Sequence, residues 1–307
     1  MQIKIARNKF LYTFLFIIIS STASAQISSL YNANRPRSMA QRWELDSVSK
    51  SGTFVITPYK PVYIIPARWS SNPNEKPVSG NPSPAYDYEE QVDYNNLEAK
   101  FQISFKVKVF ESMFWGHGDL WVAYTQLNNW QVYNKSLSRP FRELNYEPEA
   151  IVNFATDYDV LGFKGRMLGI SFNHRSNGQE QPLSRSWNRI ILQAGFEKDN
   201  WQVYVRPWLR IRGEKKEDDN PDIEEYMGRG ELIVIYSKSK DTFVFTGRHN
   251  LNFNKYTRGH AEVSWSHALK GNLNAYIQAG YGYGETMVDY NNLQATIGVG
   301  ISLVSWL

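Results

Sequence analysis

A histidine, a serine and an asparagine occur at spacings that would allow nucleophilic catalysis. Residues 168–176 alternate apolar and polar side chains, as in a strand with one apolar and one polar face. His174 and Ser176 continue the apolar set. A second alternating segment, residues 186–197, carries Asn188 on its apolar side. All three polar side chains are therefore expected on the apolar side of two neighbouring strands.

Residues two apart on a strand share a face, so His174 and Ser176 can approach each other, and the next strand can bring Asn188 beside His174. The chemistry would use a hydroxyl nucleophile, an imidazole base and an amide that fixes the tautomer. An amide suits the hydrocarbon boundary, because a carboxylate is costly to desolvate there. An H-x-S pair alone is a weak signal. The chain has no G-x-S-x-G motif, which disfavours a soluble α/β-hydrolase.

Composition excludes several classes of function. The 307 residues carry a formal net charge of +4, too weak to indicate nucleic-acid binding. Cysteine is absent, which rules out disulfides, zinc–thiolate sites and thiol catalysis. Aromatic residues make up 15% of the chain, which is typical of proteins whose alternate side chains face lipid and water.

The N-terminus has the pattern of a secretory signal. Three basic residues precede the apolar run 10–19, and a small-x-small cleavage site follows at 23–25. We expect residues 1–25 to be a signal peptide; the alternative, a membrane anchor, would need a longer apolar run. Residues 26–51 are then expected to form a periplasmic arm, and residues 52–307 a transmembrane barrel.

The remaining sequence predicts an all-β fold, an antiparallel transmembrane β-barrel of about twelve strands. Each strand has about ten residues, which is enough to cross a bilayer when tilted. An even strand count would place both termini in the periplasm and the loop between His174 and Asn188 outside the cell. The alternating segments lie near residues 53–65, 99–109, 119–126, 149–155, 163–177, 186–197, 202–212, 228–236, 242–252, 261–269, 273–283 and 293–303.

The sequence also predicts one turn of the barrel and the charges in its lumen. A turn is expected at Asp157-Tyr158-Asp159. Carboxylates such as Glu98 and Glu197 are expected to neutralise cations in a hydrated lumen, although a ring selective for anions is the alternative. The expected inward cations are Lys100, Lys106, Lys108, Arg206, Arg210 and Arg212.

Several motifs in one order resemble outer membrane phospholipase A, from about residue 98 to the C-terminus. The motifs are N-H-x-S-N-G at 173–178, S-R-S-W-N-R at 184–189, Y-T-Q at 124–126, P-F-R-E-x-N-Y-E-P at 140–148, F-A-T-D-Y at 154–158, D-D-N-P-D-I at 218–223, Y-M-G at 226–228 and G-Y-G-E at 282–285. The resemblance implies a twelve-stranded barrel that hydrolyses acyl esters of phospholipids and lysophospholipids, with calcium and a homodimer required for activity.

The resemblance also implies roles for single residues. Ser176 would be the nucleophile, His174 the base and Asn188 the orienting group, with the amide of Gly178 in the oxyanion hole. The implied calcium ligands are the Ser184 hydroxyl, the Gln179 carbonyl and the carbonyl of the partner subunit's Ser138. The family's usual arginine is missing at Gln179, although a backbone ligand survives that change. An acidic residue that the family ties to a second calcium mode in the monomer is missing at Gln181, which argues against that mode.

Gln126 lies on the apolar parity of its segment. The resemblance implies that Gln126, Ile103 and Phe105 contact a partner subunit across a flat dimer face. The alternative is a glutamine at the level of the lipid headgroups, where its polar group costs little.

Three functions follow from these patterns. The first is a calcium-dependent outer-membrane phospholipase with its site at the outer leaflet. The second is an outer-membrane channel or structural barrel in which the Ser-His-Asn group is vestigial. The third is a secreted soluble esterase.

Overall fold

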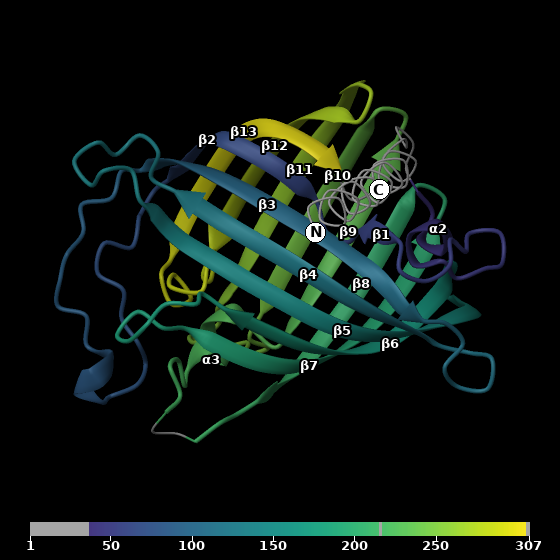
Figure 1. Cartoon of the computed structure of the whole chain (residues 1–307), viewed down its shortest axis with the longest axis horizontal. Helices are drawn as coiled ribbons and strands as arrows, with labels where there is room; N and C mark the ends of the chain where they lie inside the picture. Colours follow the sequence, from purple (N-terminus) through teal and green to yellow (C-terminus); the bar gives the residue numbers. More distant parts are fainter. Residues whose placement is uncertain (1–36, 215–216, 305–307) are drawn as a thin grey trace, which may run out of the picture.

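The computed structural model describes residues 37–214 and 217–304, so the predicted signal peptide and residues 26–36 lie outside the described part. Its strands form one antiparallel sheet that closes on itself, because β2 pairs with both β3 and β13. The short strand β1 pairs with β3 beyond the β2 pairing, so β1 and β2 fill one place in the ring. The predicted antiparallel barrel of twelve strands is confirmed (Figure 1).

The strands span β1 Ile56–Pro58, β2 Val62–Ser70, β3 Leu97–Phe110, β4 Asp119–Trp130, β5 Phe141–Val160, β6 Phe163–Ser176, β7 Ser186–Lys198, β8 Trp201–Ile211, β9 Gly230–Lys238, β10 Asp241–His249, β11 Gly259–Lys270, β12 Leu273–Gly282 and β13 Gln294–Val304. The helices are α2 Met39–Trp43, the 3₁₀ helix η1 Pro84–Tyr86 and α3 Ile223–Met227. Among the described residues, none of the helices has the length and apolar character needed to span a membrane.

Long connections gather at one end of the barrel and short turns at the other (Figure 1). We call these the loop end and the turn end. The loop end carries connections 71–96, 131–140, 177–185, 212–229, 250–258 and 283–293. The turn end carries connections 111–118, 161–162, 199–200, 239–240 and 271–272.

Strand β6 shows why the barrel has an apolar outer wall. Ser171 and Asn173 are buried, whereas Leu168, Ile170 and Phe172 are 44%, 44% and 48% exposed. Because successive side chains point to opposite faces, the exposed apolar set points away from the lumen. Other strands contribute exposed apolar residues in the same way, including Ile103, Val122, Leu192, Leu232, Phe243, Val263 and Ile297.

Helix α2 packs against inward-facing residues at the turn end. Met39 and Trp43 are buried in the same apolar cluster as Tyr59 and Trp121. The Trp43 ring makes edge contacts with Tyr59 and Trp121, at centroid distances of 5.9 and 6.0 Å. Residues 37–51, the described part of the expected N-terminal arm, therefore include a helix with a packed face.

A second apolar cluster closes the lumen at the loop end. Trp187 and Trp208 pack edge to face, with ring centroids 6.0 Å apart. They belong to one buried cluster with Ile223 from α3 and with Met287 and Tyr290 from the connection 283–293. This connection therefore folds into the barrel mouth.

Buried ion pairs fill the space between the two apolar clusters. Glu98 accepts hydrogen bonds from Arg68 at 2.6 Å and from Arg142 at 2.9 Å. Lys100 lies 2.6 Å from Glu285. The charges are paired, as the low dielectric of an interior requires.

Two expectations about the lumen need correction. Lys100, Lys106, Lys108 and Arg206 are buried, and the Arg210 side chain is only 3% exposed. Arg212, in contrast, follows the last residue of β8, and its side chain is 64% exposed. The parity of a strand stops applying where the strand ends.

Glu197 neutralises no arginine or lysine among the described residues. Its Oε1 atom instead accepts a hydrogen bond from the Met39 amide at 3.0 Å, at the start of α2. Glu98 behaves as expected.

The prediction of a turn at Asp157-Tyr158-Asp159 is wrong. Strand β5 continues to Val160, and the chain reverses at Leu161 and Gly162, whose φ angles are +52° and +80°. A two-residue hairpin turn with positive φ at both positions matches the twist of the strands it joins. Asp159 instead pairs with Lys164 across this hairpin, at 2.9 Å.

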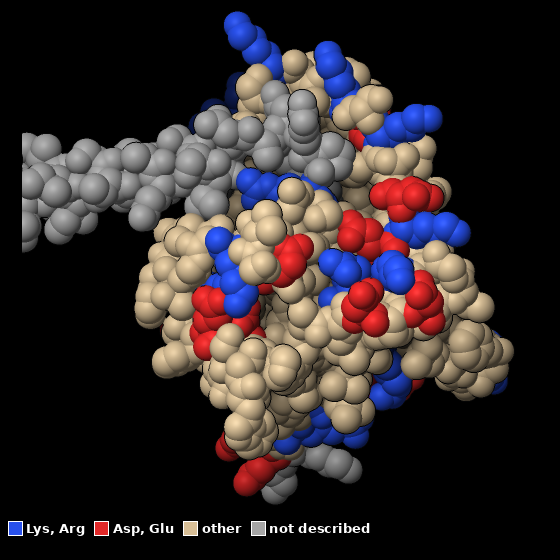
Figure 2. Space-filling view, turned by 90° about the vertical axis from the view of Figure 1, so that its right-hand side faces the viewer, with Lys and Arg blue, Asp and Glu red and all other residues tan. Residues whose placement is uncertain are grey.

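Figure 2 looks onto the turn end of the barrel. Acidic and basic side chains are interspersed on this face, without a large patch of one sign. Lys164 pairs with Asp159 there, and Lys50 pairs with Glu111. This mixture agrees with the weak net charge of the sequence.

Candidate active site

The register of three neighbouring strands brings the predicted catalytic residues together. His174 of β6 pairs directly with Asn188 of β7, and Ser176 pairs with Ser186 of β7. On the other side, Ser176 pairs with Tyr146 of β5. His174, Ser176 and Asn188 are half-buried on the outward parity of their strands, at the loop end.

A hydrogen bond joins His174 to Asn188. The distance between His174 Nδ1 and Asn188 Oδ1 is 2.8 Å. An amide oxygen can only accept, so this bond assigns the ring proton to Nδ1 and leaves the Nε2 lone pair free. In that tautomer the imidazole is able to take a proton at Nε2.

The Ser176 hydroxyl lies two residues from His174 on the same face of β6. Within the described residues it makes no hydrogen bond. Apolar side chains border the three residues, since Phe172 precedes His174 on this face and Ile211 pairs with Asn188 from β8. The hydroxyl and the imidazole thus lie beside apolar side chains of the outer wall.

Gly178 follows Ser176 by two residues and begins the turn of the loop 177–185. It is exposed and has a φ angle of +65°, a region that favours glycine. A Cβ atom at this position would lie 3.0 Å from Cε2 of Tyr146. No described residue accepts a hydrogen bond from the Gly178 amide.

Oxygen atoms surround the predicted cation ligand Ser184. Its hydroxyl donates to Asp219 Oδ2 at 2.8 Å, and the Ser186 hydroxyl donates to the same oxygen at 3.1 Å. The Gln181 side chain donates to Asp219 Oδ1 at 2.7 Å. Asp219 was not among the predicted ligands, although the D-D-N-P-D-I motif contains it.

The other two predicted cation ligands make hydrogen bonds elsewhere in the chain. The Gln179 side chain donates to Glu143 at 3.1 Å, on the lumen side of β5. Ser138 is exposed in the connection 131–140, and its amide donates to the Lys135 carbonyl at 3.1 Å. In the described part of this single chain, no hydrogen bond links Ser138 to Gln179 or Ser184.

A buried arginine supports the loop next to Ser184. Arg185 Nη1 donates to the carbonyls of Pro182 and Ser184, at 2.9 and 2.7 Å. Burial lowers the pKa of the Arg185 guanidinium from its ordinary value. The backbone around Ser184 is therefore held by two hydrogen bonds from a buried side chain.

The predicted dimer contacts lie together on β3 and β4. Ile103 pairs directly with Gln126, and Ile103 is 47% exposed. The Phe105 ring lies 5.8 Å from the Tyr124 ring. Gln126 accepts from the Tyr124 hydroxyl at 3.0 Å and donates to Asn128 at 2.8 Å. Neither Tyr124 nor Asn128 was predicted to take part.

Comparison with known proteins points to one family. The family model for phospholipase A1 matches residues 39–303. The phospholipase A1 proteins of Klebsiella pneumoniae and of Escherichia coli K12 are each 36% identical over 250 residues, which cover 81% of this chain and 82% of each relative.

Two solved structures resemble the barrel. Outer membrane phospholipase A from Escherichia coli superposes with a TM-score of 0.73 at 33% identity, over 84% of this chain and 95% of that one. The Salmonella typhi outer membrane phospholipase, crystallised as a dimer with bound calcium, gives a TM-score of 0.73 at 35% identity over the same shares. The chain belongs to the phospholipase A1 family of outer-membrane carboxylic ester hydrolases.

Proposed function

We propose that this protein is a calcium-dependent phospholipase that hydrolyses acyl ester bonds of phospholipids and lysophospholipids with Ser176, His174 and Asn188. The observation that carries the proposal is the 2.8 Å hydrogen bond between His174 Nδ1 and Asn188 Oδ1, on the outward face that also holds Ser176. A polar group on a lipid-facing wall loses solvation, so an arrangement of three such groups needs a functional reason.

The proposed reaction is an acyl transfer in two stages. Ser176 Oγ attacks the ester carbonyl while His174 Nε2 takes the hydroxyl proton. His174 then gives this proton to the departing alcohol, and an acyl-serine remains. Water attacks the acyl-serine by the same route in reverse and releases the fatty acid. Asn188 keeps the imidazole in the required tautomer throughout.

The amide of Gly178 is the proposed donor to the oxyanion. It begins the loop directly after the nucleophile strand, and no described residue accepts a hydrogen bond from it. A backbone N–H fixed before the reaction stabilises charge that develops on the carbonyl oxygen.

The residues around Ser184 are compatible with a calcium ion. Calcium prefers oxygen ligands, and the Ser184 hydroxyl already lies 2.8 Å from a carboxylate oxygen of Asp219. The proposed ligands are the Ser184 hydroxyl, the Gln179 carbonyl and the carbonyl of the partner subunit's Ser138. Bound calcium would stabilise the negative charge that develops on the substrate. The calcium-bound dimer of the Salmonella typhi relative supports this part of the proposal.

We also propose that the active form is a homodimer at the outer leaflet. The candidate contacts Gln126, Ile103 and Phe105 lie on the outer wall, two to four strands from the site. The site lies at the loop end, where an outward-facing serine would meet the ester bonds of lipids without passage through the lumen. Dimer formation would bring a second wall against the substrate.

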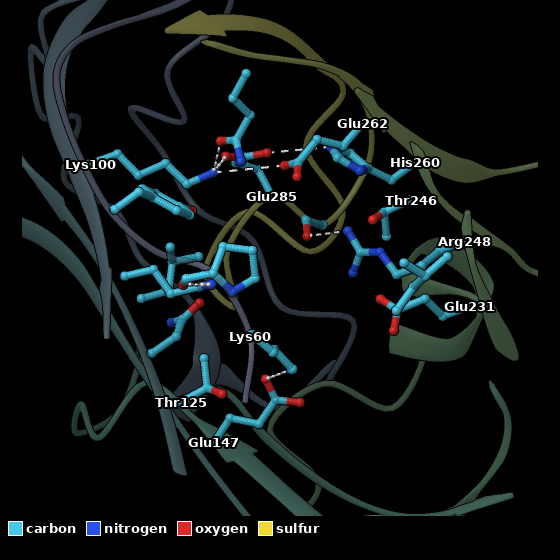
Figure 3. Close-up of a pocket in the computed structure, with 18 of the residues that line it drawn as sticks. Lys60, Lys100, Thr125, Glu147, Glu231, Thr246, Arg248, His260, Glu262 and Glu285 are labelled. Carbon is cyan, nitrogen blue, oxygen red and sulfur yellow. Dashed lines mark hydrogen bonds and ion pairs between the residues drawn. The ribbon is translucent and has the colours of Figure 1, made fainter. Parts of the chain in front are cut away.

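The filled lumen supports a hydrolase rather than a channel. A cavity of about 140 Å³ lies in the polar middle, and charged side chains cross it in pairs (Figure 3). Lys60 binds Glu147 at 3.0 Å, and Lys100 binds Glu285. Apolar clusters lie beyond it at both ends.

Fatty-acid release by the detergent-solubilised protein tests the proposal. We expect release from phospholipid micelles in calcium and its loss after a chelator is added. Conductance across a planar bilayer without any release of lysophospholipid would contradict the proposal and favour a channel.

A further inference from the structure

One side chain closes the loop 177–185. Asn177 is 2% exposed, and its amide donates to the Arg185 carbonyl at 3.0 Å. Its Oδ1 atom accepts from the Arg185 amide at 2.9 Å and from the Gln179 amide at 3.4 Å. Its Nδ2 atom donates to the Leu183 carbonyl at 2.8 Å. A single asparagine therefore ties the first residue of the loop to its third, seventh and ninth.

A second loop at the same end of the barrel repeats this arrangement. The amide of Asn250 donates to the Arg258 carbonyl at 3.0 Å. Asn250 Oδ1 accepts from the Arg258 amide at 3.3 Å and from the Asn252 amide at 3.1 Å. Its Nδ2 atom donates to the Tyr256 carbonyl at 2.8 Å. Both loops thus begin with asparagine, end eight residues later with arginine, and form the same four hydrogen bonds.

The residue after each asparagine has a positive φ angle of similar size. Gly178 has a φ angle of +65° and Leu251 one of +57°. In the second loop, the Leu251 amide donates to Nδ1 of His249, the residue before the asparagine, at 2.9 Å. The position of His249 is occupied by Ser176 in the first loop. By analogy with the Leu251 amide and His249, we expect the Gly178 amide to face the side chain of Ser176.

We propose that Asn177 is a positioning residue that holds the Gly178 amide beside Ser176, ready to bind the oxyanion. This inference rests on the proposed hydrolase function. Asn177 itself is buried and has no role in bond making. Its four hydrogen bonds fix the backbone before substrate arrives, so no reorganisation is needed when charge develops on the carbonyl oxygen. In the second loop the residue after the asparagine is Leu251, so the positive φ angle at this position goes with the hydrogen bonds of the asparagine and does not require a glycine.

The two loops provide a matched pair of variants, Asn177→Ala and Asn250→Ala. Each variant loses three side-chain hydrogen bonds within its loop, and Asn250→Ala also loses the bond from Asn250 Nδ2 to the Glu225 carbonyl at 3.1 Å, so its unfolding midpoint should fall at least as far as that of Asn177→Ala. We expect kcat for phospholipid hydrolysis to fall about 100-fold in Asn177→Ala, as when an oxyanion donor is lost, with KM changed less than about threefold. In Asn250→Ala, kcat should stay within about twofold of the unsubstituted protein, because its loop carries no oxyanion donor.

A conservative variant separates positioning from folding. Asn177→Asp keeps the oxygen that accepts from Arg185 and Gln179, but it replaces the donor to the Leu183 carbonyl with a second oxygen that cannot donate when ionised. It should therefore recover at least about tenfold of the kcat that Asn177→Ala loses. A folded Asn177→Ala protein with kcat near that of the unsubstituted protein would overturn the proposal. So would a folded Asn177→Asp protein with kcat no higher than that of Asn177→Ala, or an equal loss of kcat in Asn250→Ala. An unsubstituted protein that releases no fatty acid would instead overturn the proposed function, and this inference with it.

Discussion

His174 and Asn188 are separated by 14 residues in the sequence, yet their Nδ1 and Oδ1 atoms lie 2.8 Å apart. The contact follows from the register of β6 and β7, which pairs these two positions directly. The amide oxygen accepts the Nδ1 proton, so Nε2 is left to act as the base. The orientation of the imidazole therefore depends on one cross-strand hydrogen bond.

Removal of this bond should slow catalysis without unfolding the barrel. We expect Asn188→Ala to lower kcat by about 10- to 100-fold, within the range that a positioned base contributes. Asn188→Asp should lose less, because its oxygen still accepts the ring proton. Steady-state release of fatty acid in calcium measures both variants. Equal activity of Asn188→Ala and the unsubstituted protein would show that the bond has no role in catalysis.

The parity of the strands made much of this site predictable from sequence. Alternation with a period of two places His174 and Ser176 on one face whatever the tertiary structure. It also predicts the count of strands, since each alternating segment became one strand of the ring. Asn188 could be aligned with His174 because the two strands follow each other in the sequence and therefore pair in the antiparallel sheet.

Other features depend on contacts that no local pattern contains. Asp219 reaches Ser184 across 35 residues, from a loop with no periodicity. Arg212 follows the parity of β8 in sequence but lies beyond its end. Packing of Trp43 inside the turn end needs the barrel to be closed first. A one-dimensional pattern predicts faces and strands, and it does not predict which loops meet.

Asp219 should set the calcium requirement of the enzyme. Its carboxylate accepts hydrogen bonds from the Ser184 and Ser186 hydroxyls, so it lies beside the proposed calcium ligand Ser184. We expect Asp219→Asn to raise the calcium concentration for half-maximal activity at least about tenfold, because the negative charge beside the proposed ligand Ser184 is removed. Asp241→Asn is the control, since Asp241 also accepts two side-chain hydrogen bonds but lies at the turn end. A titration with the same midpoint in both variants would contradict this role.

Helix α2 should contribute strongly to stability. Trp43 is 3% exposed and contacts Tyr59 and Trp121. Trp43→Ala should lower the free energy of unfolding by about 3–5 kcal/mol, as is usual for buried tryptophan. Val48 is 94% exposed, so Val48→Ala should change it by less than about 0.5 kcal/mol. Urea unfolding in detergent, followed by tryptophan fluorescence, measures both; a change below about 1 kcal/mol for Trp43→Ala would show that the helix packs only loosely.

The outer wall of β3 and β4 should form the dimer interface. Ile103→Asn places a second polar group beside Gln126 and removes apolar contact area, so the dimer fraction in calcium should fall several-fold. Leu232→Asn is a matched control on β9, because Leu232 is also outward and 40% exposed. Sedimentation in detergent reports the dimer fraction. Loss of dimer in Leu232→Asn alone would place the interface on the opposite wall.

The nucleophile is the centre of the account, and Ser176→Ala tests it most directly. Release of fatty acid from phospholipid micelles in calcium should fall at least about 1,000-fold, because the acyl-serine cannot form. Ser302 is a buried serine of β13, and the control variant Ser302→Ala should retain full activity. Both proteins should unfold at the same urea concentration as the unsubstituted protein. Undiminished release from a folded Ser176→Ala protein would contradict the assignment of the nucleophile and the mechanism built on it.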